Sequence, residues 1–154
     1  NDSVRNNILM GNEQLDPWES LRYVCLDGEV KAMEDGIETL VGSGGVRLSG
    51  GQGQRLSLAR TISHKRPLLV LDDPFSALDR NTEAQIFENL KKLASDSIVL
   101  LISHRLYLFP ELDQVIWMDG GNQTVGTHQE LMESVPDYAA LFHAQEGGKQ
   151  YAEA

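Results

Sequence analysis

The residues of this sequence best suited to chemistry begin with a glycine-rich run, Leu48–Gln52 (LSGGQ). Ser49 stands where a helix N-cap is expected, and Gly50 and Gly51 follow with no Cβ to keep a ligand from the backbone. The next residues are strong helix formers with an apolar face. A helix that begins in this way presents free N–H groups and a positive dipole end, so the run predicts an anion-binding site. The alternative is a glycine-rich turn before an ordinary surface helix.

A second group of reactive side chains follows two apolar runs. Leu68–Leu71 leads directly to Asp72 and Asp73, and the later run 97–102 leads to His104. Such runs are typical of buried strands in a parallel sheet, and open α/β sheets bind ligands at the carboxyl ends of their strands. Asp72 is therefore a candidate Mg²⁺ ligand, Asp73 a candidate to orient water, and His104 a candidate to hydrogen-bond a phosphate. The alternatives are a simple turn after the first strand and a capping role for His104.

The elements that position these residues alternate between helix and strand in the second half of the chain. Short helices are expected within residues 1–35, where Asp16 and Pro17 form a helix start. Further along, the patterns predict helices near 48–64, 80–93, 127–133 and 136–145, strands at 68–71, 97–102 and 113–118, and a tight turn at 119–122 into a short strand. This alternation predicts an α/β fold with helices packed on a sheet.

Composition excludes several classes of function. Asp and Glu number 23 against 13 Lys and Arg, and the net charge of −10 argues against a nucleic-acid surface. No apolar run approaches the length of a membrane span, and Cys25, the single cysteine, allows no internal disulfide. The phosphate-cradling run G-x-x-x-x-G-K-[ST] is absent, so the chain is not expected to bind nucleotide tightly alone. The start without methionine suggests a piece cut from a longer protein.

Taken together, these motifs resemble the nucleotide-binding domain of an ATP-binding cassette (ABC) transporter over almost the whole chain. The matching stretches, in family order, are the signature at Leu48–Gln52 with its helix at 54–60, the Walker B strand at 68–72, the D-loop at 76–79, the switch histidine His104 and the run 126–131 (GTHQEL). By this resemblance, residues 1–65 are the helical subdomain with the signature helix. Residues 66–154 are the C-terminal half of the RecA-like, P-loop NTPase core, and the Walker A loop and Q-loop lie upstream of Asn1.

The resemblance also implies partners, cofactors and site residues. In the family, two such domains pair head to tail around two ATP molecules with Mg²⁺, and each signature faces nucleotide held by the other domain. The implied nucleotide contacts are Ser49, Gly50, Gly51, Gln52 and Asp79. Asp72 serves the metal, and Asp73 and His104 are catalytic. The full-length protein is then an ATPase at the cytoplasmic face of a membrane, and the isolated piece is soluble and inactive, with exposed apolar edges that favour oligomerisation.

Two positions depart from the family pattern. Asp73 stands where hydrolytically competent members carry Glu, and shortening by one methylene withdraws the carboxylate by about 1.5 Å, although catalytic placement must hold within roughly 0.5 Å. The predicted loss is of the order of 10²-fold or more. The pattern resembles the degenerate half of a heterodimeric exporter, in which one composite site hydrolyses ATP quickly and the other mainly holds it. In the loop Val41–Gly45, Ser43 replaces the Glu usual in the X-loop of exporters, which contacts the transmembrane domains. The glycines around Ser43 keep the family pattern, and this pattern favours an exporter over an importer.

The sequence is also compatible with two other functions. A regulatory ABC domain that binds ATP and dimerises without turnover would also carry Asp73. A soluble ABC ATPase of the DNA-repair or translation-factor kind is expected to show a basic surface or a coiled-coil insertion, which the net charge of −10 and the short spacing from signature to Walker B do not favour.

Overall fold

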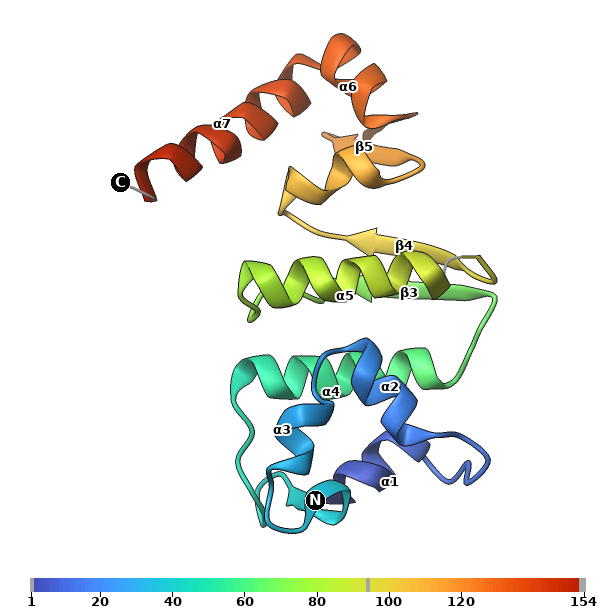
Figure 1. Cartoon of the computed structure of the whole chain (residues 1–154). Coiled ribbons are helices and arrows are strands. Elements are labelled where there is room, and N and C mark those ends of the chain that lie inside the picture. Colours follow the sequence, from blue (N-terminus) through green and yellow to red (C-terminus); the bar gives the residue numbers. More distant parts are fainter. Residues whose placement is uncertain (1, 94, 153–154) are drawn as a thin grey trace. The chain divides into compact units, whose positions relative to one another are not determined.

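The chain folds into two compact units, residues 1–102 and 103–154 (Figure 1). The structure is a computed structural model that describes residues 2–93 and 95–152. The border between the units at 102/103 differs from the subdomain border predicted at 65/66. Compactness and family subdomains are different properties, so the predicted border stays a prediction.

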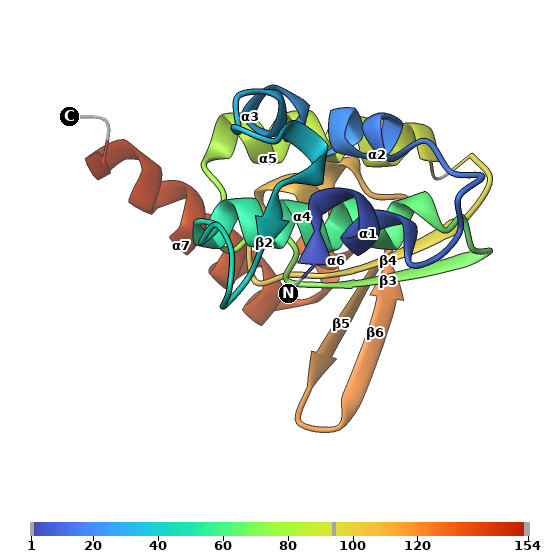
Figure 2. The same cartoon turned by 90° about the horizontal axis from the view of Figure 1, so that it is seen from below.

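The first unit begins with short helices gathered around one long helix, α4 (Figures 1 and 2). Their bounds are α1 Val4–Leu9, α2 Pro17–Tyr23, α3 Asp27–Lys31, η1 Gly36–Glu38 and α4 Gly50–Ser63, with the antiparallel pair β1 Asp2–Ser3 and β2 Leu40–Val41. As predicted, Pro17 opens α2, and Asp16 caps it by accepting a hydrogen bond from the Trp18 N–H at 2.9 Å. The apolar face of α4, including Leu56 and Ala59, is buried, so tertiary packing fixes the helix that carries the glycine-rich run at its start.

Two parallel strands complete this unit. β3 (Leu68–Asp72) pairs with β4 (Ile98–Ile102), and α5 (Arg80–Leu93) is the helix between them. The prediction that both strands are buried on both faces is wrong for this chain. Leu69 and Leu71 are buried, whereas Leu68 and Val70 are 54% and 52% exposed. The reason is that the helices of this unit cover only one side of the strand pair (Figure 2). The predicted exposure of apolar surface is thus present, on a face rather than only an edge.

The second unit holds a hairpin and two helices on a core of its own. Its elements are η2 Leu106–Glu111, β5 Val115–Asp119, β6 Asn122–Gly126, α6 His128–Ser134 and α7 Pro136–Ala152. The tight turn is confirmed, because Gly120 and Gly121 have φ of 52° and 90°, which suit glycine. The strand predicted at 113–118 is present, but it pairs with β6 in this antiparallel hairpin rather than joining β3 and β4. The core side chains are Leu106, Phe109, Val115, Leu131, Tyr138 and Phe142.

Candidate functional site

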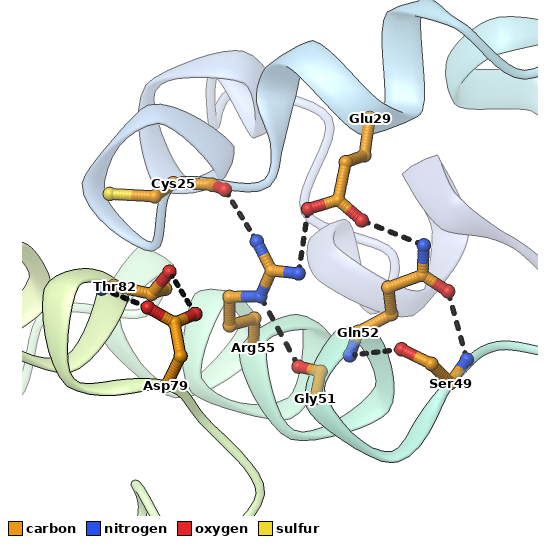
Figure 3. A network of polar contacts seen from close by, with 8 residues as sticks. All are labelled: Cys25, Glu29, Ser49, Gly51, Gln52, Arg55, Asp79 and Thr82. Carbon is orange, nitrogen blue, oxygen red and sulfur yellow. Dashed lines mark hydrogen bonds and ion pairs between the residues drawn. The ribbon is translucent and has the colours of Figure 1, made fainter. Parts of the chain in front are cut away.

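The start of α4 has the geometry that the sequence predicts. Ser49 Oγ accepts a hydrogen bond from the Gln52 N–H at 3.2 Å, and Gln52 Oε1 accepts one from the Ser49 N–H at 2.8 Å, which is a complete capping box (Figure 3). Among the described residues, none accepts a hydrogen bond from the N–H groups of Gly50 and Gly51 or from the Ser49 hydroxyl. Three donors at the positive end of a helix are therefore available to an anion.

The side chain of Gln52 continues into a network that the sequence does not reveal (Figure 3). Its Nε2 donates to Glu29 at 2.7 Å, and the guanidinium of Arg55 pairs with the same carboxylate at 2.7 Å. Arg55 also donates to the backbone oxygens of Cys25 at 2.6 Å and Gly51 at 3.3 Å. Arg55 thus connects the first turn of α4 to α3 and to the segment just before α3. Both polar ends of the Gln52 amide are occupied, so its predicted contact with nucleotide stays a prediction.

Glu29 is the anionic centre of this network. Burial raises the pKa of its carboxyl, but hydrogen bonds from Gln52 and Arg55 and the positive charge of Arg55 outweigh burial and lower the pKa below its ordinary value. Glu29 is therefore ionised at neutral pH and holds both donors in place. No signal in the sequence marks it, because it lies 23 residues before Gln52 and only the fold brings the two together.

The two glycines of the run differ in what they permit. A Cβ at Gly51 would lie 2.9 Å from the backbone oxygen of Ala77, too close for a real side chain. A Cβ at Gly50 would meet only the Ala77 methyl at 3.7 Å, which is ordinary contact. Gly51 is thus required by the approach of the loop after β3, in addition to any role toward a ligand, whereas Gly50 leaves its backbone open.

The two aspartates lie at the carboxyl end of β3, as predicted. Asp72 is exposed and, within the described residues, makes no hydrogen bond with its side chain. No group of three or more His, Cys, Asp or Glu side chains in the described part of the chain could hold a metal by itself. A single open carboxylate fits Mg²⁺, which takes one or two protein carboxylates and completes its shell with phosphate oxygens and water.

Asp73 is the first residue after β3. Its N–H donates to the backbone oxygen of Ile102 at 2.8 Å, and its φ of 45° lies in the left-handed region. Aspartate is enriched severalfold in that region among non-glycine residues. The backbone at this position therefore suits the residue that is present.

Asp79, predicted to contact nucleotide, caps α5 in this structure. Its carboxylate accepts hydrogen bonds from the N–H groups of Asn81 and Thr82 at 3.0 Å and from the Thr82 hydroxyl at 2.7 Å (Figure 3). The Thr82 hydroxyl, followed by these N–H groups, lowers the pKa of the Asp79 carboxyl. The nucleotide role of Asp79 stays a prediction.

His104 belongs to the second unit, whereas the other predicted site residues all lie in the first. Its backbone is held by α7, because Gln145 Nε2 donates to the His104 oxygen at 2.7 Å and Gln145 Oε1 accepts from the Leu106 N–H at 2.9 Å. The sequence offers no signal for Gln145, which lies 41 residues further along the chain.

A parallel strand that ends in two carboxylates, beside a helix with bare N–H groups at its start, is typical of ligand-binding α/β domains. Comparison with known proteins shows which families the chain resembles. Residues 28–76 match the family described as ABC transporter. Over 150 residues, 95% of this chain, the sequence is 39% identical to the Bacillus subtilis protein named Glutathione/L-cysteine transport system ATP-binding/permease protein CydC, of which it covers 26%.

Two further relatives agree. The ATP-dependent lipid A-core flippase of Burkholderia thailandensis is 40% identical over 94% of this chain and 25% of its own length. A solved structure titled as a bacterial Atm1-family ABC exporter with ATP bound superposes with a TM-score of 0.87 at 29% identity, over 95% of this chain and 26% of that one. The chain is homologous to ABC exporters over about 95% of its length, and residues 28–76 match the ABC transporter family. It spans about a quarter of the length of these relatives.

Proposed function

We propose that this chain is part of the ATPase domain of an ABC exporter, in which ATP binding and hydrolysis between two such domains drive transport across a membrane. The observation that carries the proposal is the start of α4, where a closed capping box leaves three donors available to an anion. Similarity to exporters over 95% of the chain supports it.

Each proposed contact follows from the chemistry of one side chain. The Ser49 hydroxyl and the N–H groups of Gly50 and Gly51 donate to phosphate of ATP held by the second domain. Asp72 offers its open carboxylate to Mg²⁺ of the nucleotide in this chain's own site. ATP and Mg²⁺ supply the cleavable phosphoanhydride and the neutralising charge. His104, whose backbone Gln145 holds, donates to a terminal phosphate.

The proposed contact with the transmembrane domains is the loop Val41–Gly45. The loop is tight, since a Cβ at Gly45 would overlap the Leu40 oxygen, and the Val46 N–H donates to that oxygen at 2.8 Å. No helix within residues 2–93 or 95–152 is long and apolar enough to cross a membrane. The relatives that carry permease or exporter in their names support membrane domains in the full-length protein.

We infer that this chain's own site is the slow one of an asymmetric pair. The Asp73 carboxylate is one methylene shorter than glutamate, and a misplacement of about 1 Å can cost about 100-fold in rate. The start of α4, by contrast, keeps every feature that would complete the site of the second domain. A domain that binds ATP without turnover is the competing outcome.

The test uses the full-length protein with its partner, whose own Walker B carboxylate is neutralised so that only the site bearing Asp73 can turn over. Asp73→Glu is expected to raise ATP hydrolysis about 10-fold or more, partly offset because glutamate is less suited to a φ of 45°. Asp73→Asn is expected to change it less than about twofold, since little catalysis is left to lose. Asp96→Glu, in an exposed turn, is the matched control.

Two results would contradict the proposal. If Asp73→Asn abolished a rapid hydrolysis and Asp73→Glu added nothing, Asp73 would be a fully effective catalytic carboxylate and the slow-site inference would be wrong. If neither the wild type with its intact partner nor Asp73→Glu hydrolysed ATP, the chain would belong to a regulatory domain without turnover.

A further inference from the structure

Gln54, in the second turn of α4, uses its whole carboxamide on one loop. Its Nε2 donates to the backbone oxygen of Asp73 and to Ser76 Oγ, each at 2.9 Å. Its Oε1 accepts from the Ala77 N–H, also at 2.9 Å. One side chain on the helix of the signature run thus holds three points of the loop that leaves β3.

That loop, residues 73–79, carries reactive groups at both ends. It begins at Asp73, whose backbone is in the left-handed region, and ends at Asp79, which caps α5. Between them Phe75 is buried, with 1% of its surface exposed, and the Leu78 N–H donates to the Phe75 oxygen at 3.0 Å. The loop is therefore a compact turn anchored in the core.

A second contact seats the same loop on the first turn of α4. The backbone oxygen of Ala77 comes so close to Gly51 that no Cβ fits there. Gly51 and Gln54 are three residues apart and share one side of the helix. Close approach at Gly51 and hydrogen bonds at Gln54 therefore act on the same segment, and together they fix its distance and its register along α4.

Resting on the proposed function, we propose that Gln54 is a positioning residue that joins the start of α4 and the loop 73–79 into one rigid body. The donors of Ser49, Gly50 and Gly51 serve the site of the second domain, and Asp73 serves this chain's own site. When nucleotide in the site of the second domain displaces α4, the hydrogen bonds of Gln54 move the Asp73 carboxylate in this chain's own site as well. Gln54 itself touches no substrate.

No common replacement reproduces this contact. Methionine has a similar length and helix propensity but makes none of the three hydrogen bonds. Glutamate keeps the acceptor for the Ala77 N–H but loses both donors and places a negative charge beside the Asp73 oxygen. Since catalytic groups must be held within about 0.5 Å, release of the loop is expected to slow both sites.

The experiment compares Gln54→Met and Gln54→Glu with Gln85→Met, a control at an exposed position on α5. All are made in the full-length protein with its partner, once with both proteins otherwise unchanged and once with Asp73→Glu and the partner's Walker B carboxylate neutralised. Both Gln54 variants are expected to lower kcat about 10-fold in each background, with less than about threefold change in the ATP concentration at half-saturation. Gln85→Met is expected to leave all values unchanged.

Hydrogen exchange of the peptide covering residues 73–79 gives a reading that is independent of turnover. Gln54→Met is expected to speed exchange at the Ala77 N–H about 10-fold, and Gln54→Glu less, because it retains the acceptor. The midpoint of thermal unfolding is expected to stay within about 4 °C of the wild type. Two Gln54 variants are made so that the experiment still tests the proposal if only one of them folds.

Several results would overturn the proposal. If either folded Gln54 variant keeps kcat within twofold of the wild-type value, Gln54 is not a positioning residue. A fall in only one background excludes coupling of the two sites, and a parallel fall in kcat, ATP affinity and thermal midpoint shows a purely structural role. A wild type that hydrolyses no ATP overturns the proposed function itself, and this inference with it.

Discussion

Two helices of this chain begin with the same local device, yet only one of these starts is suited to bind a ligand. At α4, Ser49 and Gln52 form a capping box, and at α6, Thr127 and Glu130 form another, with the Glu130 carboxylate accepting from the Thr127 N–H at 2.8 Å. A capping box is common at helix starts and stabilises them. Its presence therefore does not by itself indicate function.

The difference lies in what surrounds each box. After Ser49 come two glycines, and the amide of the neutral Gln52 donates to Glu29, which also pairs with Arg55. After Thr127, the third position holds a carboxylate, and an anion would meet like charge there. Thus the start of α4 combines bare backbone donors with a neutral capping residue, Gln52, which Glu29 holds in place. The start of α6 is instead closed by the negatively charged Glu130.

The largest expected effect is on ATP hydrolysis, and it distinguishes the start of α4 from the start of α6. Ser49→Ala in the full-length protein with its partner is expected to lower ATP hydrolysis about 10- to 100-fold, since hydrogen bonds to charged groups contribute about 1.5–3 kcal/mol. Thr127→Ala is expected to change it less than twofold. Each loses one helix cap, so urea unfolding is expected to show a similar loss of about 1 kcal/mol in both. Equal losses of activity would show that capping alone explains Ser49.

A smaller effect tests whether the network behind α4 matters. Glu29→Gln removes the charge that holds Gln52 and Arg55 and is expected to cost about 1 kcal/mol of unfolding free energy and a few-fold in ATP hydrolysis. Asp27→Asn is the control on the same helix, because its exposed pair with Lys31 at 2.8 Å contributes less than about 0.5 kcal/mol. If both variants behaved alike, the polar network would be irrelevant to the α4 start.

The smallest effect concerns pH. Burial lowers the pKa of the His128 imidazole below its ordinary 6.5, and its Nδ1 lies 2.7 Å from the Tyr138 hydroxyl. The folded state then binds fewer protons than the unfolded state, so this stability is full above pH 6.5 and is lost as pH falls through the folded pKa. At α4, the lowered pKa of Glu29 places the corresponding loss below its ordinary 4.5.

Hydrogen-exchange protection, corrected for intrinsic rates, measures this difference. Between about pH 7.5 and pH 5.5, amides of α6 are expected to lose protection about twofold to fivefold, and amides of α4 to keep theirs. His128→Gln is expected to abolish the pH dependence at α6. Equal loss at both helices, or persistence in the variant, would assign the effect to other groups.

Much of the local structure could be predicted from the sequence alone. The caps at Asp16 and Ser49, the glycine turn at 120–121 and the strands that end in Asp72 and before His104 follow from interactions within a few residues. Such signals are readable because a cap or turn satisfies backbone groups that are its neighbours in the chain. The resemblance to ABC transporters, too, rests on short runs of residues that follow one another in a fixed order.

Tertiary structure alone decided which residues support these motifs. Gln52 meets Glu29 across 23 residues, Gln54 meets the loop 73–77 across about as many, and Gln145 meets His104 across 41. It also decided that the apolar strands are bare on one face and that Gly51 is fixed by Ala77. These contacts depend on how helices pack over distances that no local pattern encodes, because a polar side chain in a helix has the same local signal whether it faces water or a distant loop.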